Sequence, residues 1–543
     1  MVQGTVYSAF QRSVERYRNL DFLCVLAETA QHYGIPARTF SYGEAAAEVS
    51  TLIRHYARVG LGPGHRVGLM LENRPAMFFH WLALNSLGVS AVPLNRDWRE
   101  AELEYVIGHS EIVAAVVPES RVEEVRRAAQ GASRDVPVTP PALDELAEVS
   151  ASPALTSEPD VRTECALLYT SGTTGRPKGC VLTNEYYLWA GTWYAELGGL
   201  CRLEEGRERL LTPLPMTHMN AMAFSTMVML LTGGCIIPVD RFHPRTWGES
   251  VRSSQATLLH YLGVMPAMLL GMEAAPSDRR HSIRFGFGAG VSPRLHAAFE
   301  ERFGFPLVEA WAMTETGAGA VIIANREPRK VGTACFGRPA ALVDYRILTA
   351  EGIPASPGQQ GELWVRSKAE RPQFGFFREY LKDAQASSEA WREGYFHTGD
   401  IVFADEDGDL HFVDRKKNVI RRSGENISAV EVESVLLQHP RIVSVGVAAV
   451  PDEVRGDEVM ACVVPRGILR REEEIALARE LVDCCLQKLA YFKAPGFVAF
   501  CEQLPLTTTE KIQRARLSEL ARELAGGNGV IDLRSMKKRN PGA

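Results

Sequence analysis

The chain has 543 residues, of which 46% are hydrophobic and 23% charged, and its formal net charge is −6. This length exceeds one ordinary hydrophobic core, so two or more domains are expected. The composition is typical of a globular protein, and the acidic balance lacks the basic footprint that binding to nucleic acid or to an anionic membrane surface would need.

The cysteines and the N-terminal segment indicate the cellular compartment of the protein. The ten cysteines are scattered and form no CxxC pair, which favours reduced thiols over disulfides or a zinc site. Residues 1–20 carry charges where a signal peptide needs an apolar core. A cytoplasmic location is therefore expected. The basic tail at 537–539 is interpreted as a solvated terminus.

The first part of the chain alternates helical and strand-like segments. Ser41 and Glu44 have the spacing of a capping box in front of an apolar-periodic run. The alternation predicts a largely parallel sheet in an α/β domain. Residues 120–160, rich in Pro, Ala, Ser and Glu, are expected to form a loosely ordered connection. The expected strands are 66–73, 89–95 and 112–118, and the expected helices are 76–88 and 101–110.

A glycine-rich segment follows at 169–179, with the sequence YTSGTTGRPKG. Glycine allows positive φ and close approach to a ligand, so successive N–H groups can line one concavity. The hydroxyl side chains add donors and Lys178 adds a compact charge, which together suit a polyphosphate. The spacing is not that of a Walker A loop. A polar surface loop is the alternative interpretation.

Two later segments bear on topology. Met219–Val239 carries no charge but contains several polar residues, a glycine pair and a proline. We expect a buried helix, a glycine break and a strand there, and no membrane span. After Gly361 short strands and turns replace the alternation, which predicts a small β-rich lobe.

The charged run at 414–418 is the predicted domain boundary, with one domain at 1–415, a hinge at 416–418 and a second domain at 419–543. Ser428 and Glu431 repeat the capping-box spacing. About 125 residues can hold their own core, and a short polar connection permits hinge motion. The expected strands of the second domain are 442–450, 458–465 and 496–504, with a helix at 471–489.

The 169–179 segment resembles the phosphate loop of the adenylate-forming superfamily, which contains acyl-CoA synthetases, peptide-synthetase adenylation domains and luciferases. Further matching segments follow in the expected order over nearly the whole chain. The resemblance implies a large α/β N-terminal domain with a small β-rich lobe, followed by a smaller, mobile α+β domain. The residues that it places around ATP or AMP are Thr170, Ser171, Gly172, Thr173, Thr174, Gly175, Lys178, Gly288, Ala289, Gly290, Glu309, Ala310, Trp311, Ala312, Met313, Thr314, Asp400, Arg415 and Lys511.

Within this set the resemblance implies particular roles. Trp311 takes the aromatic place beside adenine, Thr314 is a catalytic hydroxyl that contacts phosphate, and Glu315 is the Mg²⁺ ligand. One carboxylate suffices for magnesium, which keeps water and phosphate oxygens. The family usually has Tyr and Gly where this chain has Trp311 and Ala312.

Three further residues take roles from the same resemblance. Asp400 would accept from both ribose hydroxyls, with Arg415 as the matching ribose contact. Lys511 is the catalytic cation: by touching the attacking carboxylate and the α-phosphate, it would align them and offset developing charge. The family has Gly before this lysine, whereas this chain has Glu510.

The acid and the thiol have their own expected sites. His218 matches a catalytic position beside the substrate carboxylate, although a buried structural histidine is the alternative. Lys417 matches the hinge. The segments around 213–222 and 414–428 are similar to the carnitine/crotonobetaine-CoA ligase group. The expected acyl pocket contains His218, Met219, Asn220, Phe224 and Val291, and the expected coenzyme A channel contains Ser423, Gly424 and Glu425.

The expected activity is that of an AMP-forming carboxylic acid–CoA ligase that uses ATP, Mg²⁺ and coenzyme A. Transfer to a carrier protein, a luciferase-like oxygenase and a non-catalytic binding module are the alternatives. The partners are a small carboxylic acid and coenzyme A, without nucleic acid. The oligomeric state stays open, a homodimer included.

Overall fold

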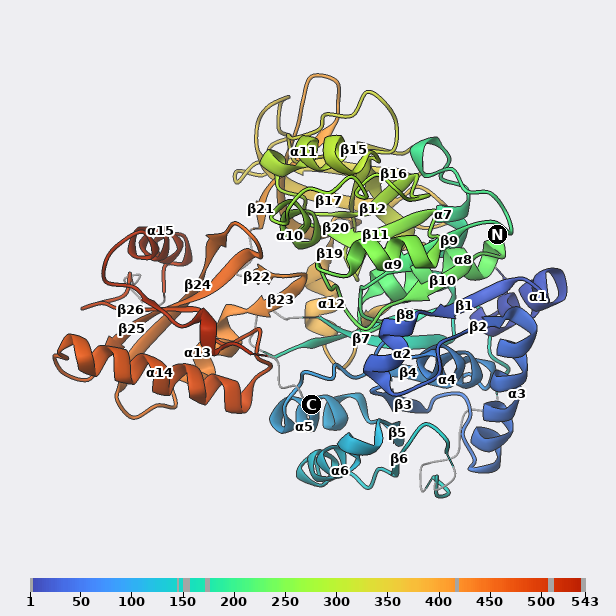
Figure 1. The fold of residues 1–543 in the computed structure, drawn as a ribbon. Helices are drawn as coiled ribbons and strands as arrows, with labels where there is room; N and C mark the ends of the chain where they lie inside the picture. Colours follow the sequence, from blue (N-terminus) through green and yellow to red (C-terminus); the bar gives the residue numbers. More distant parts are fainter. Residues whose placement is uncertain are drawn as a thin grey trace. The chain divides into compact units, whose positions relative to one another are not determined.

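Figure 1 shows the computed structural model of the chain as a ribbon. The structure describes residues 3–143, 146–149, 157–170, 176–415, 419–505 and 512–538. Contacts between residues divide the chain into two compact units. Unit 1 comprises Met1–Arg96, Ile107–Leu168 and Gly179–Asp414; unit 2 comprises Asp97–Val106, Tyr169–Lys178 and Arg415–Ala543. The predicted hinge at 416–418 lies outside the described residues, so the domain boundary stays a prediction.

The larger sheet of unit 1 has 14 strands, and it changes from parallel to antiparallel pairing at β13. The strands from β1 through β10, β9, β11 and β12 to β13 are parallel neighbours, whereas the later strands pair antiparallel. The strands are β1 Asp21–Val25, β2 Arg38–Ser41, β9 Arg209–Thr212, β10 Cys235–Pro238, β11 Leu258–Leu262, β12 Phe285–Ala289, β13 Leu307–Trp311, β14 Ile322–Ile323, β15 Cys335–Pro339, β16 Val343–Leu348, β17 Gly361–Ser367, β19 Trp391–Arg392, β20 Tyr395–Ala404 and β21 Leu410–Arg415.

A second sheet has seven strands in the order β18-β8-β7-β4-β3-β5-β6. Its strands are β3 Arg66–Leu69, β4 Ser90–Pro93, β5 Ala114–Val116, β6 Val138–Thr139, β7 Glu164–Thr170, β8 Lys178–Thr183 and β18 Glu379–Tyr380. The helices of this part of the chain are α1 Val6–Tyr17, α2 Ala27–Tyr33, α3 Tyr42–Arg58, α4 Pro75–Ser86, α5 Glu100–Ser110, α6 Val122–Gly131, α7 Asn184–Ala195, α8 Thr226–Thr232, α9 Trp247–Ser254, α10 Val264–Leu270, α11 Pro293–Phe303 and α12 Ala384–Ala390.

The predicted α/β alternation is confirmed. The capping box forms at the start of α3, where the Glu44 amide donates to Ser41 Oγ at 3.2 Å and the Ser41 amide donates to Glu44 Oε2 at 2.8 Å. Such reciprocal bonds satisfy donors that the first helical turn leaves open. Helix α4 is buried on nearly every face, as its continuous apolar sequence requires.

One expectation about unit 1 is wrong, and another is confirmed with an earlier start: short antiparallel strands do follow Gly361. Residues 120–160 include the amphipathic helix α6, which buries Val122, Val125, Ala128 and Ala129 along one stripe. The antiparallel part of the larger sheet begins before Gly361, since β14 and β15 already pair antiparallel with their neighbours. Helix α6 was not expected because a short amphipathic helix contains many polar residues, so its segment is polar in composition.

The uncharged segment 219–239 has the predicted helix, glycine break and strand. It forms a π-helical turn at Asn220–Ser225, then α8, then Gly233 at φ +69°, and then the buried strand β10. None of the described helices is both long and apolar enough to cross a bilayer.

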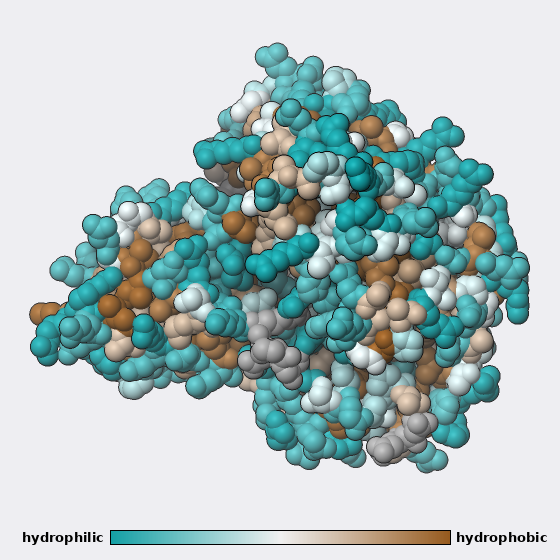
Figure 2. Space-filling view, viewed as in Figure 1, coloured by the Kyte–Doolittle hydropathy of each residue, from teal (hydrophilic) through white to brown (hydrophobic). Residues whose placement is uncertain are grey.

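The C-terminal part of unit 2 is an α+β structure with a six-stranded sheet in the order β23-β22-β25-β26-β27, with β24 paired to β25. The face drawn in Figure 2 is mostly hydrophilic, with hydrophobic side chains showing between α14 and α15. The elements are β22 Val419–Arg422, β23 Glu425–Ser428, α13 Ala429–Leu436, β24 Ile442–Asp452, β25 Gly456–Pro465, α14 Arg471–Lys488, β26 Phe497–Phe500, α15 Arg514–Ala525 and β27 Ile531–Asp532.

Side-chain partners in this unit depart from two sequence expectations. Ser428 Oγ accepts from the Glu431 amide at 3.4 Å, but the Glu431 carboxylate binds Lys493 Nζ at 2.8 Å, so half of the capping box forms. The basic tail is not simply solvated, because the Lys537 side chain is fully buried against Glu458.

Candidate active site

The parallel strands β11, β12 and β13 end at one edge of the larger sheet, where ligands bind in open α/β sheets. Two glycines allow the backbones to meet there. A Cβ at Gly288 would lie 2.2 Å from Tyr261 O, and one at Gly263 would lie 1.6 Å from Gly290 O. Gly290 itself has φ +81°, a conformation that favours glycine. These backbones therefore pack more closely than any side chain permits.

Glu309 on β13 binds this glycine turn through its carboxylate. Oε2 accepts from the Gly290 amide at 2.9 Å, and Oε1 accepts from the Val291 amide at 3.3 Å and from Tyr261 Oη at 2.5 Å. Burial raises the pKa of Glu309, and the hydrogen bond from Tyr261 opposes that rise. Glu309, expected to contact nucleotide, thus holds the β12 turn in place.

Trp311 and Asp400 form a direct pair. The Trp311 indole N–H donates to Asp400 Oδ2 at 2.8 Å. Asp400, on β20, is fully buried, and Trp311 is 6% exposed. The residue expected beside adenine therefore orients the carboxylate expected at the ribose.

The loop after β13 carries Thr314 and Glu315, and two tyrosines hold it. Tyr186 Oη donates to the Thr314 carbonyl oxygen at 2.9 Å, and Tyr380 Oη donates to Glu315 Oε1 at 2.9 Å. Glu315 is buried while Thr314 is half-buried. A single oriented carboxylate fits the donor set that magnesium takes from proteins.

His218 lies half-buried just before the π-helical turn. The turn is closed by hydroxyls: Ser225 Oγ donates to Asn220 O at 3.1 Å, and Thr226 Oγ1 donates to Ala221 O at 2.8 Å. Turns of this type occur frequently at functional sites. The geometry places His218 and Asn220 at a non-standard helix start.

A buried histidine holds Asn220. His260 Nδ1 lies 2.7 Å from Asn220 Oδ1, and Tyr194 Oη lies 3.0 Å from His260 Nε2. Because an amide oxygen only accepts, Nδ1 carries the proton and Nε2 accepts from Tyr194. Burial lowers the pKa of His260 to about 3, so the ring is a neutral structural group.

The expected acyl-pocket residues differ in burial. Phe224 is 2% exposed and packs against Trp193 and Phe287, with ring centroids 5.6 and 6.0 Å away. Val291 is buried in a different hydrophobic cluster, whereas Met219 is half-buried. The acyl pocket therefore stays a prediction.

Unit 2 carries the ends of the phosphate loop and the hairpin expected near coenzyme A. Thr170 and Lys178 are half-buried, and Tyr105 Oη donates to Pro177 O at 2.9 Å. Ser423 and Gly424 form the turn between β22 and β23. Ser171, Gly172, Thr173, Thr174, Gly175, Lys417 and Lys511 lie outside the described residues, as does the side chain of Arg415.

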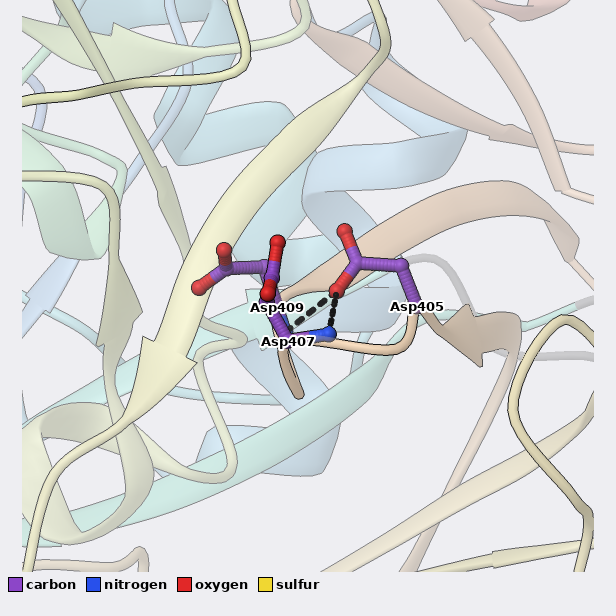
Figure 3. A group of neighbouring side chains, drawn as sticks. All are labelled: Asp405, Asp407 and Asp409. Carbon is purple, nitrogen blue, oxygen red and sulfur yellow. Dashed lines mark hydrogen bonds between the residues drawn. The ribbon is translucent and has the colours of Figure 1, made fainter.

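An acidic group outside these segments has the spacing of a cation site, and Figure 3 shows Asp405, Asp407 and Asp409 converging on one turn. Lys330 Nζ lies 2.5, 2.7 and 3.2 Å from the three carboxylates, so a protein cation already binds all three. The backbone amides of Asp407 and Asp409 donate to Asp405 Oδ1. The cluster is a turn held by ion pairs.

The sequence did not predict the residues whose buried hydrogen bonds hold the site residues in place. Asn73, which is 2% exposed, donates to Leu214 O and Val239 O and so joins the loops after β9 and β10. Tyr261 and Tyr380 act similarly on Glu309 and Glu315. No motif marks these residues, since their partners are distant in sequence.

Comparisons with known proteins identify the family. Residues 10–381 match the AMP-binding enzyme family, and residues 431–511 match the AMP-binding enzyme C-terminal domain. Crotonobetaine/carnitine–CoA ligase from Salmonella paratyphi A is 30% identical over 495 residues, covering 88% of this chain and 93% of that protein.

Solved structures share the fold at lower identity. A double mutant of o-succinylbenzoate CoA synthetase from Bacillus subtilis has a TM-score of 0.79 and 23% identity, over 95% of this chain and 99% of that one. Amide bond synthetase McbA from Marinactinospora thermotolerans has a TM-score of 0.77 and 23% identity, over 94% and 99%. The chain therefore belongs to the AMP-binding enzyme family, as an ATP-dependent, AMP-forming carboxylic acid–CoA ligase.

Proposed function

We propose that the chain converts a carboxylic acid and ATP into an acyl-adenylate and pyrophosphate, and then passes the acyl group to the sulfur of coenzyme A with release of AMP. A carboxylate has no good leaving group, and AMP supplies one. The observation that carries this proposal is the buried Trp311–Asp400 pair, which joins an adenine-sized aromatic ring to a carboxylate suited to a diol.

The first step uses the residues that the resemblance places around ATP and the acid. Asp400 accepts from the ribose hydroxyls, and Thr314 and Lys178 bind phosphate oxygens. Glu315, oriented by Tyr380, would hold Mg²⁺, which when bound offsets phosphate charge. His218 lies beside the acid carboxylate, and Lys511 aligns that carboxylate with the α-phosphorus.

The second step needs room for a thiol. We assign the Ser423–Gly424–Glu425 hairpin to the pantetheine channel and Lys417 to the hinge that exchanges Lys511 for this hairpin. Gly424 at φ +90° permits close backbone approach. Arg415 is assigned to the ribose.

The identity of the acid needs its own assay, since fold does not fix substrate. The relatives named crotonobetaine/carnitine–CoA ligase justify placing betaine-type acids in a panel beside short, medium, aromatic and dicarboxylic acids. The readout is AMP release with coenzyme A, compared with carrier protein as acceptor. AMP release only with a carrier protein, or light or oxygen uptake, would favour an alternative.

Pyrophosphate exchange tests the first half-reaction directly. An acid-dependent exchange of pyrophosphate into ATP is expected for at least one member of the panel. Failure of every acid would overturn the proposal and favour a binding module.

We also propose a cytoplasmic location for the protein. The ten cysteines form no disulfide, which supports this location.

A further inference from the structure

Three charged side chains are buried together in unit 2. Lys537 Nζ contacts Glu458 Oε1, and Arg422 Nε donates to Glu458 Oε2 at 2.8 Å. The side chains of Lys537 and Glu458 are fully buried, and that of Arg422 is 6% exposed. Lys537 follows a short 3₁₀ turn at Arg534–Met536 near the end of the described chain. A tail residue is thus locked inside the C-terminal fold.

Burying these charges is costly, because desolvation of each ion opposes the attraction between them. One carboxylate serves two cations here, so the group is not a balanced ion pair. Burial lowers the pKa of Lys537 to about 7, with Arg422 adding to the fall and Glu458 opposing it. Three buried charges of this kind stay together only if the surrounding groups fix their positions.

The backbone around Glu458 supplies that support. A Cβ at Gly496 would lie 2.5 Å from Glu458 Cδ, so the absence of a side chain there leaves space for the carboxylate. The Leu533 amide donates to Gly496 O at 2.8 Å, and the Gly496 amide donates to Val459 O at 2.8 Å. The tail is therefore tied to β25 through backbone bonds as well as through Lys537.

Arg422 connects this group to the hairpin turn. It is the last residue of β22, directly before Ser423 at φ +52° and Gly424 at φ +90°. Positive φ at both central residues defines a type I′ turn, which is strained for Ser423. The Ser423 amide also donates to Arg455 O at 2.9 Å. Two contacts thus hold the strained turn: the side chain of Arg422 binds Glu458, and the backbone amide of Ser423 binds Arg455 O.

We propose that Lys537 is a positioning residue for thioester formation: by fixing Glu458, and through it Arg422, it holds the Ser423–Gly424 turn in the conformation that the thiol channel needs. This role rests on the proposed function, which assigns that turn to coenzyme A. Lys537 acts through other residues and touches no substrate.

The test compares Lys537→Met with Lys538→Ala in the full chain. Met keeps most of the length but cannot bind Glu458, and Lys538 is an exposed neighbour. Pyrophosphate exchange reports the first step, and thioester formation from supplied acyl-AMP and coenzyme A reports the second. Hydrogen exchange of the peptide that spans Ser423 reports the turn.

Lys537→Met should leave pyrophosphate exchange unchanged, slow thioester formation by roughly 10- to 100-fold, and speed hydrogen exchange at Ser423. Lys538→Ala should match the wild type. Lys537→Gln keeps a donor for Glu458, so its rate of thioester formation should lie between those of Lys537→Met and the wild type. This variant serves as the probe if the Met variant does not fold.

Equal losses in both half-reactions would reduce Lys537 to a stabilising residue and overturn the proposal. Unchanged hydrogen exchange at Ser423 would overturn it as well. A wild-type chain that makes adenylate but no thioester would instead refute the coenzyme A assignment, and hydrogen exchange would still decide whether Lys537 holds the turn.

Discussion

The indole nitrogen of Trp311 lies 2.8 Å from a carboxylate oxygen of Asp400, 89 residues later in the chain. The tyrosine usual at this position of the family could not donate from the same atom. Trp311 therefore offers an aromatic face and, at its indole nitrogen, a donor that orients Asp400.

Trp311→Phe should raise the KM for ATP and lower kcat/KM by about 10- to 100-fold, because a hydrogen bond to a charged group contributes about 1.5–3 kcal/mol. If Trp311 acts through Asp400 on the ribose, the loss should shrink when 2′-deoxy-ATP replaces ATP. Initial rates of pyrophosphate exchange with both nucleotides measure this.

Trp364→Phe is the matched control for this variant. The Trp364 indole nitrogen has no hydrogen-bond partner in the described part of the chain, so its removal should not change the preference for ATP over the deoxy analogue. An identical loss with both nucleotides in Trp311→Phe would show that Trp311 contributes through the adenine alone.

Glu309→Gln should weaken adenylate formation and stability together. The amide NH₂ of Gln would face N–H donors that now meet carboxylate oxygens, and each buried group left unsatisfied costs about 1–3 kcal/mol. Urea unfolding and pyrophosphate exchange measure the two effects. Glu301→Gln on the exposed face of α11 is the control, and wild-type behaviour of Glu309→Gln would remove the role assigned to this carboxylate.

The Lys537 amine should make the stability of unit 2 depend on pH. Its pKa is lowered to about 7 in the fold, with Glu458, Arg422 and Arg455 as the charged neighbours, whereas an unfolded lysine titrates near 10.4. Between these values the unfolded chain binds the extra proton, so stability rises with pH by up to about 1.4 kcal/mol per unit. Below about pH 7 the cost of the buried charge is fully present.

Urea unfolding of wild type and Lys537→Met at about pH 6.5 and about pH 9 checks this. The wild type should gain stability relative to Lys537→Met as pH rises, because the other groups titrate alike in both proteins. A difference that is constant over this range would mean that Lys537 keeps its proton when buried.

Lys511→Ala should abolish pyrophosphate exchange and leave thioester formation from supplied acyl-AMP largely intact. The lysine is proposed to act on the α-phosphorus only in the first step. Lys538→Ala again provides the control. Parallel loss of both half-reactions would remove the division of labour assigned to Lys511.

Periodicity and short-range spacing predicted the elements well. The capping spacing at Ser41 and the helix at α14 depend on residues within one or two turns, and both formed. Helix α6 was missed, since its narrow apolar stripe lies in a segment rich in charges and prolines. Local patterns therefore predicted the α/β order but not every short element.

The contacts that hold the candidate site could not be predicted from the sequence. Tyr261 and Glu309 are 48 residues apart, and Lys537 and Glu458 are 79 apart. Such pairs follow from strand order and burial, which no local pattern encodes. Motif positions such as Asp400 could be named from resemblance, but their protein partners could not.

The π-helical turn at Asn220–Ser225 accommodates one more residue than a regular helical turn, and side-chain hydroxyls complete its bonding. Insertions or deletions at this point can therefore rotate the side chains before α8 while β9 and β10 keep their register. A length change of one residue there would therefore alter the predicted acid site while leaving the sheet unchanged.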